Sequence, residues 1–142
     1  MLKQNTWITL NSAPTGQDGK PYKDGSCITL AGNIIYAQKG SGKHNYFSAC
    51  DIAGASWAKK EIIPLKHTAL GDVKNKVKDG AAIPSDGNII YIIKGGGKQD
   101  FWKYVPGTPG NWIPLDIIPK LNKKVFPRAV LRLLILMDMF IC

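Results

Sequence analysis

The strongest constraint on the fold of this chain is an internal repeat. Residues 28–43 read ITLAGNIIYAQKGSGK, and residues 83–98, which lie 55 positions later, read IPSDGNIIYIIKGGGK. Ten of these sixteen positions are identical without a gap. A repeat of this period is typical of proteins that stack one supersecondary unit on the next, because each unit buries its apolar faces against its neighbours.

The 55-residue register extends beyond this window. It matches Tyr46-Phe47 with Phe101-Trp102, and it matches Trp57 with Trp112. In this register Ala49 stands where Tyr104 does. The repeat unit therefore includes a pair of adjacent aromatic residues and a tryptophan that follows them.

A third tryptophan indicates that the chain enters the repeat near its end. Trp7 precedes Pro14 by seven residues, the same spacing that separates Trp57 from Pro64. The link from this proline to the next repeat is nine residues long in one case and fourteen in the other. Variation of length confined to one link predicts a surface loop.

Four short segments in each copy are rich in β-branched and aromatic residues and are separated by Gly, Asp, Asn or Pro, which predicts antiparallel strands and turns. We expect strands at about 26–30, 34–39, 46–51 and 57–63, and at 81–84, 89–94, 101–104 and 112–118. Gly32 and Gly87 fall in the first turn of each copy, and Tyr36 and Tyr91 on the second strand. Four such strands in about 50 residues predict the blade of a β-propeller, an all-β fold.

At this point the residues resemble a known family. The order of an apolar strand, a glycine pair at Gly95 and Gly96, a strand that ends in Tyr104, and Trp112 eight residues later resembles the kelch motif. The resemblance covers about residues 7–125, and the second copy fits the motif better than the first. It implies a kelch-like β-propeller whose first strand in each blade lines a central channel.

The chain is too short to close such a ring. Propellers have about four to eight blades, whereas the repeat accounts for two complete blades and flanking strands, an open fragment. We divide the chain into an outer strand and loop of a preceding blade (1–22), a first blade (23–77), a second blade (78–127) and the start of a third (128–142). The expected partners are missing blades of the same propeller, or another copy bound through the open blade faces.

The last segment departs from the repeat and reads RAVLRLLILMDMFIC. A slip of one base in the reading frame would convert it: Met137-Asp138 would then encode Gly, and Met139-Phe140 would encode Val. The remaining codons permit the strand pair that a third blade requires, so we interpret residues 128–142 as frameshifted. The alternative is a genuine apolar terminal strand or helix. A membrane span is not expected, because fourteen residues that include Arg132 and Asp138 fall short of the roughly 20 apolar residues needed.

The composition argues against a nucleic-acid partner. The net charge of +9 comes from 17 Lys and 2 Arg against 10 acidic residues, and both arginines, Arg128 and Arg132, lie in the last fifteen residues. Nucleic-acid readers use arginine for bidentate contacts with bases and phosphates. We therefore interpret the scattered lysines as solubilising charge.

No catalytic, metal-binding or cofactor-binding set is evident. The segments around Gly40 and Gly95 lack the first glycine and the Ser or Thr of a P-loop. His44 and His67 have no Cys or carboxylate at metal-ligand spacing. We expect no cofactor and no enzyme activity in this chain.

The sequence favours a binding module that recognises a protein or a carbohydrate. Two alternatives stay open: a fragment of a propeller glycoside hydrolase or oxidase whose catalytic residues lie in missing blades, and a structural cell-surface repeat. A location outside the cytoplasm or at the cell surface is favoured for a lysine-rich propeller of this kind. Fold alone does not identify the ligand.

Overall fold

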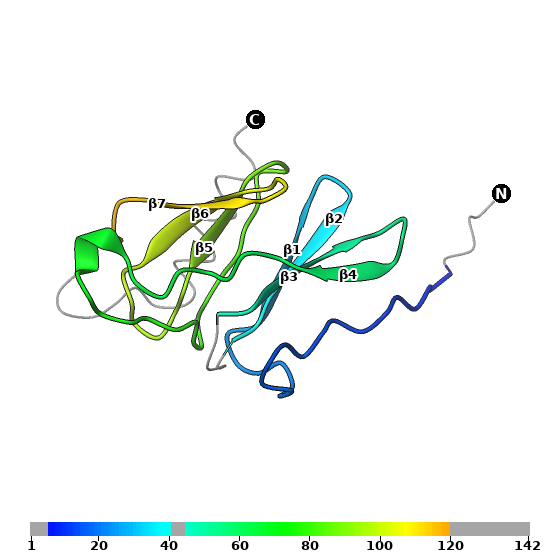
Figure 1. The fold of residues 1–142 in the computed structure, drawn as a ribbon, viewed down its shortest axis with the longest axis horizontal. Coiled ribbons are helices and arrows are strands. Elements are labelled where there is room, and N and C mark those ends of the chain that lie inside the picture. The colour runs from blue at the N-terminus through cyan, green and yellow to red at the C-terminus, as the bar shows by residue number, and fades with distance from the viewer. Residues whose placement is uncertain (1–5, 41–44, 120–142) are drawn as a thin grey trace.

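The computed structural model describes residues 6–40 and 45–119. These residues form two antiparallel sheets with no α-helix between them, as expected for an all-β chain (Figure 1). The expected start of a third blade, at 128–142, lies outside the described residues. Within those residues, no helix is long and apolar enough to cross a membrane.

The first sheet contains four strands in sequence order. They are β1 (Cys27–Ala31), β2 (Ile34–Gln38), β3 (Phe47–Asp51) and β4 (Ser56–Lys59). The sequence predicted all four, although β4 ends well before Pro64. Gly32 adopts a positive φ of 58° in the turn between β1 and β2, a conformation that glycine adopts without steric cost.

The second sheet contains β5 (Ile90–Ile93), β6 (Phe101–Val105) and β7 (Asn111–Pro114). The strand predicted at 81–84 is reduced to two isolated bridges, Ala82 with Ile93 and Ser85 with Ile90. These bridges keep the register of β1 with β2, where Thr29 pairs with Tyr36. Pro84 occupies the position of Thr29 and has no N–H to donate, so the ladder is interrupted there.

The outer strand expected around Trp7 is absent from the described residues 6–22. A strand requires a neighbour with which to pair its backbone groups, and β4 is the last strand of the first sheet. The N-terminal segment instead runs as an extended chain along that sheet (Figure 1). It is held there by side-chain contacts that are described below.

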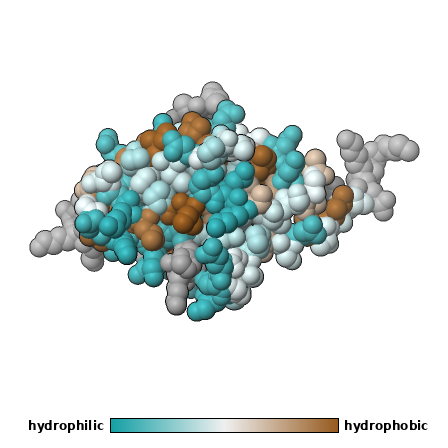
Figure 2. All heavy atoms as spheres, in the orientation of Figure 1, coloured by the Kyte–Doolittle hydropathy of each residue, from teal (hydrophilic) through white to brown (hydrophobic). Residues whose placement is uncertain are grey.

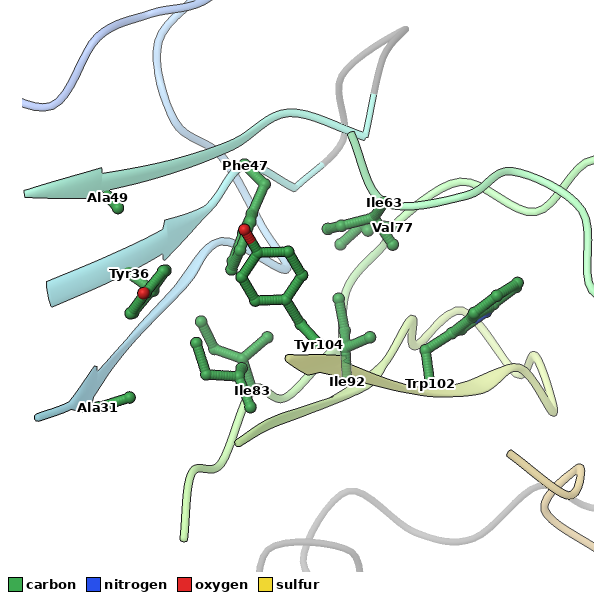
Figure 3. Packing of buried hydrophobic residues seen from close by; sticks show 11 residues of the cluster. Ala31, Tyr36, Phe47, Ala49, Ile63, Val77, Ile83, Ile92, Trp102 and Tyr104 are labelled. Carbon is green, nitrogen blue, oxygen red and sulfur yellow. The ribbon is translucent and has the colours of Figure 1, made fainter. Parts of the chain in front are cut away.

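The core lies between the two sheets. Side chains alternate between the two faces of each strand, so that Ala31, Tyr36, Phe47 and Ala49 of the first sheet face Ile83, Ile92 and Tyr104 of the second sheet (Figure 3). The segment between the sheets contains one turn of 3-10 helix, η1 (Thr68–Leu70), and passes beside Trp102 through His67. The two copies therefore bury their apolar surface against each other.

Candidate functional site: the stacking interface between the repeats

An aromatic cluster fills the contact between the two sheets. The rings of Tyr36 and Phe47 stack at 5.6 Å on the first sheet. From the second sheet, Tyr104 lies edge-on to Phe47 at 5.1 Å, and Trp112 packs against both Phe47 and Tyr104. Edge-to-face pairs at these distances stabilise a core beyond the burial of their area.

The tryptophan on the last strand of each copy, β4 or β7, makes the same contact with the part of the chain that precedes that copy. The indole N–H of Trp112 donates to the carbonyl of Glu61, 2.9 Å away, and that of Trp57 donates to the carbonyl of Asn11, 2.7 Å away. Glu61 follows Trp57 by four residues, and Asn11 follows Trp7 by four residues. The repeat in the sequence is therefore also a repeat in three dimensions.

The lysine that ends the second strand makes a second repeated contact. Lys39 donates through Nζ to the carbonyl of Thr15, and Lys94 donates to the carbonyl of Pro64 and, at 3.4 Å, to that of Leu65. Thr15 and Leu65 each follow the proline of the preceding repeat. In both copies this lysine therefore fixes the link between repeats to the sheet that follows it.

Lys94 also belongs to a buried ion pair. Its Nζ lies 3.0 Å from the carboxylate of Asp100, and neither side chain is exposed. Asn75, from the link, donates to the other carboxylate oxygen of Asp100, and its carbonyl accepts from Lys94. Burial lowers the pKa of Lys94, while the hydrogen bond and the charge of Asp100 oppose that shift. These contacts satisfy charges that would be costly to bury alone.

Glu61 joins the end of β4 to the second sheet. Its carboxylate accepts from the hydroxyl of Tyr104 at 2.6 Å and from the amide of Gly110 at 3.1 Å. Burial alone would raise the pKa of Glu61, but these hydrogen bonds, together with its own backbone amide and the charge of Lys60, outweigh it and the pKa is lowered. Burial and the same carboxylate raise the pKa of Tyr104. The two copies are thus linked by a charge-assisted hydrogen bond beside the aromatic cluster.

The glycines of the repeat motif are required by close backbone contacts. A Cβ on Gly95 would lie 2.4 Å from the amide of Ala81, and one on Gly40 would lie 2.3 Å from the carbonyl of Asp24. Gly96 donates to the carbonyl of Asp79. This glycine holds the end of the second strand against the start of the first strand of the same copy.

The two turn glycines contact each other across the interface. The amide of Gly32 donates to the carbonyl of Gly87 at 2.8 Å. Both adopt a positive φ, and Asp86 fixes the second turn by accepting from the amides of Asn88 and Ile89. The sequence identified both glycines as part of the repeat, but it gave no indication that they contact each other.

The ladders correct one detail of the repeat. Gln38 pairs with Phe47, and its equivalent Ile93 pairs with Phe101, so Phe47 corresponds to Phe101 and not to Trp102. Likewise Cys50, which pairs with Trp57, corresponds to Tyr104, which pairs with Trp112. The expected match of Ala49 with Tyr104 is therefore wrong by one residue. The Gly-rich turn is one residue shorter in the second copy and absorbs the difference.

The side chains of each sheet point alternately to two faces. We call the face that points toward the next copy the forward face and the face that points toward the preceding part of the chain the backward face. The forward face of the first sheet carries Ala31, Tyr36, Phe47 and Ala49, which contact the second sheet. The corresponding forward face of the second sheet carries Asp86, Tyr91, Phe101 and Lys103. Tyr91 and Phe101 stack at 6.2 Å, as Tyr36 and Phe47 do at 5.6 Å. The same ring pair is therefore present on both sheets.

The structure brings together three of the six predicted aromatic motif residues and leaves Trp7, Trp57 and Tyr91 outside the cluster. Tyr36, Tyr104 and Trp112 meet in the aromatic cluster. Trp57 lies on the opposite side of the first sheet against Asn11, and Trp7 is fully exposed. Sequence reasoning did not identify Lys94, Asp100 or Glu61 as residues that join the two copies. For Lys94 there was a signal, because an identical lysine, Lys39, occupies the same position in the first copy.

The described residues contain no cluster of three or more His, Cys, Asp or Glu side chains that could hold a metal ion. No protein-family model matches the sequence, and no curated protein matches it. The candidate site is thus defined by the geometry of the stacked repeats alone.

Proposed function

We propose that this chain is part of a kelch-like β-propeller that acts as a non-catalytic module for binding a protein or a carbohydrate. Support for the propeller comes from the way in which consecutive sheets stack. Strand order follows the sequence in each sheet, and the tryptophan and lysine contacts between a copy and the preceding chain recur in both copies. Repetition of one contact set along the chain is the property on which stacked-repeat folds depend.

The observation that carries the binding proposal is the placement of the variable link. The repeated aromatic residues are used in packing, whereas the segment between Pro64 and Lys78 is five residues longer than its counterpart between Pro14 and Lys23. It exposes Val73, Lys66 and Asp72. Loops that vary on a rigid scaffold are the usual location of binding residues, so we place the ligand at this end of the sheets.

The test is a ligand screen with a mapped contact surface. The full chain is screened against a glycan array and a displayed peptide library, and any ligand is titrated while amide shifts are recorded by NMR. We expect the shifts to concentrate in residues 64–78. Val73→Asp should weaken binding about tenfold or more, corresponding to roughly 1.4 kcal/mol.

The matched control is Ile52→Asp, since Ile52 is similarly exposed but lies in the turn between β3 and β4, at the other end of the strands. Equal loss of binding in the two variants would reject the proposed surface. Turnover of a bound glycan would replace the binding function with an enzyme activity.

A further inference from the structure

The link between the two copies carries three lysines in a regular array. Between the turns at 71–72 and 79–80, residues 73–78 run without a turn or helix, and Asn75 and Val77 within them are 2% and 1% exposed. Lys74, Lys76 and Lys78 occupy the alternate positions and are exposed. Such alternation is typical of an extended segment, so the three lysines lie on one side of it, about 6–7 Å apart along the chain. We call these three residues the lysine array.

The buried side chains between the lysines fix the array to the sheets. Asn75 donates through its side chain to the buried carboxylate of Asp100. The amide of Val77 donates to the side-chain oxygen of Asn45, 3.1 Å away, and the stem of Lys78 lies over the Gly-rich turn of the second copy. A surface held in this way loses little conformational entropy when a ligand binds.

The charge of the lysine array is not used within the protein. None of the ion pairs in the part of the chain that the structure describes includes one of its three lysines. Asp72, the acidic residue that precedes the array, pairs with Lys66 at 2.7 Å. Figure 2 shows hydrophilic side chains on the surface over this link, beside η1. The array therefore presents positive charge to solvent.

The shorter link, from Pro14 to Lys23, has no such array. It ends in a lysine as the longer link does, but Gly19 and Pro21 stand at the two preceding alternate positions. A need for solubility alone does not explain this difference between two links that hold equivalent sheets. The array belongs to the link that varies in length, where binding residues are usually found.

We propose that the lysine array binds an extended acidic peptide segment of a partner protein, with a carboxylate at every second position. Alternate side chains of an extended peptide lie on one side at the same two-residue spacing. A peptide that runs along residues 74–78 therefore brings one carboxylate to each lysine in register. The inference rests on the placement of the ligand at residues 64–78 proposed above, and it names the chemistry of that ligand.

The contacts are ion pairs on an exposed surface, which sets their strength. Each such pair contributes little, so we expect a dissociation constant on the order of 0.1–1 mM at low ionic strength. Binding should weaken in about 0.5 M salt, because salt screens exposed charges.

The test is an NMR titration of the full chain at low ionic strength with two peptides of identical composition. One is acetyl-Glu-Thr-Glu-Thr-Glu-Thr-Glu-amide, and the other is acetyl-Glu-Glu-Thr-Thr-Thr-Glu-Glu-amide. We expect the alternating peptide to shift the amides of residues 73–78 and to bind severalfold more tightly than the second peptide, which has the same charge in another order.

Lys76→Glu should weaken binding of the alternating peptide about fivefold or more, since it replaces an attraction by a repulsion. Lys20→Glu is the matched control, because it makes the same change of charge at an exposed lysine of the shorter link. It should leave the dissociation constant nearly unchanged, and the amide spectra show whether both variants are folded.

Equal affinity for the two peptides, or equal weakening by the two substitutions, would overturn the inference and indicate attraction by net charge alone. Tighter binding of polygalacturonate than of the alternating peptide, at the same lysines, would replace the peptide by an acidic polysaccharide. If neither peptide binds while another ligand shifts residues 64–78, this inference fails and the proposed binding surface stands. If every ligand that binds shifts other residues instead, the proposed surface fails as well.

Discussion

At the scale of single residues, the glycine that closes the second strand of the second copy has no room for a side chain. Gly95 adopts a φ of 69°, and a Cβ there would lie 2.4 Å from a backbone amide. The side chain of alanine would therefore add both backbone strain and a clash that no rotamer change relieves. Both effects act on the junction between the first two strands of the copy.

We expect Gly95→Ala to destabilise the protein by about 2 kcal/mol or more, the sum of a strained backbone conformation and overpacking. Gly19→Ala is the control, because Gly19 has a φ of 60° but nothing within 4 Å of its Cβ position. Urea unfolding measures both variants. Equal losses would mean that the close backbone contact does not contribute.

The buried ion pair of Lys94 and Asp100 gives a second prediction at this scale. Lys94→Met removes the ion pair of the buried Asp100 carboxylate, to which the Asn75 amide still donates, so we expect a loss of about 3–5 kcal/mol. Adding Asp100→Asn should recover part of this loss, because the uncompensated charge is gone. Free energies of unfolding for the single and double variants test this coupling.

The exposed pair of Lys66 and Asp72 provides the comparison. Their contact distance is 2.7 Å, yet the side chains are 48% and 96% exposed. Lys66→Met should therefore cost less than about 1 kcal/mol. A loss as large as that of Lys94→Met would show that burial is not the reason for the difference.

At the scale of the structural elements, the contact of Glu61 with the second sheet makes the packing of the sheets sensitive to acid. The pKa of Glu61 is lowered in the folded protein from its ordinary value of 4.5. The carboxylate therefore contributes stability above about pH 4.5, and that stability is lost as the pH falls through the lowered folded value.

We expect Glu61→Gln to be less stable than the wild type at pH 7 and to lose less stability between pH 7 and pH 3. Tyr104→Phe removes one donor to the carboxylate and leaves the Gly110 amide in place, so it should give an intermediate pH dependence. Thermal unfolding at several pH values measures all three proteins. A Glu61→Gln profile parallel to that of the wild type would contradict this role.

The elements also show how far sequence reasoning reaches. Seven strands lie where alternation and turn residues predicted them, because those signals are local. The interruption of the first strand of the second copy at Pro84 was not predicted. The one-residue shift of β6 was also missed, because a gapless alignment of the two copies is dominated by the identical glycines and lysines on either side of the turn. Placing Phe47 opposite Phe101, with one residue removed from the turn, would have given the correct faces. The contacts of Glu61 and Asp100 depend on side chains that the sequence does not bring together.

At the scale of the whole molecule, stacking gives equivalent residues unequal environments. Tyr36 is 2% exposed beneath the second sheet, whereas Tyr91 is half-buried at the equivalent position. We expect Tyr36→Ala to cost about 3–5 kcal/mol, as for other large aromatic residues in a core. Tyr91→Ala should cost clearly less when both are measured by urea unfolding at low protein concentration. Similar losses would mean that the forward face of the second sheet is as well covered as that of the first.

The tryptophan and lysine contacts also have a direction along the chain. Trp57, Trp112, Lys39 and Lys94 all donate to carbonyls of residues that precede their own copy. During synthesis, the acceptors for each copy have therefore left the ribosome before the donors do. Each new sheet can complete its contacts on a surface that already exists, so the molecule is suited to assembling in the order in which it is made.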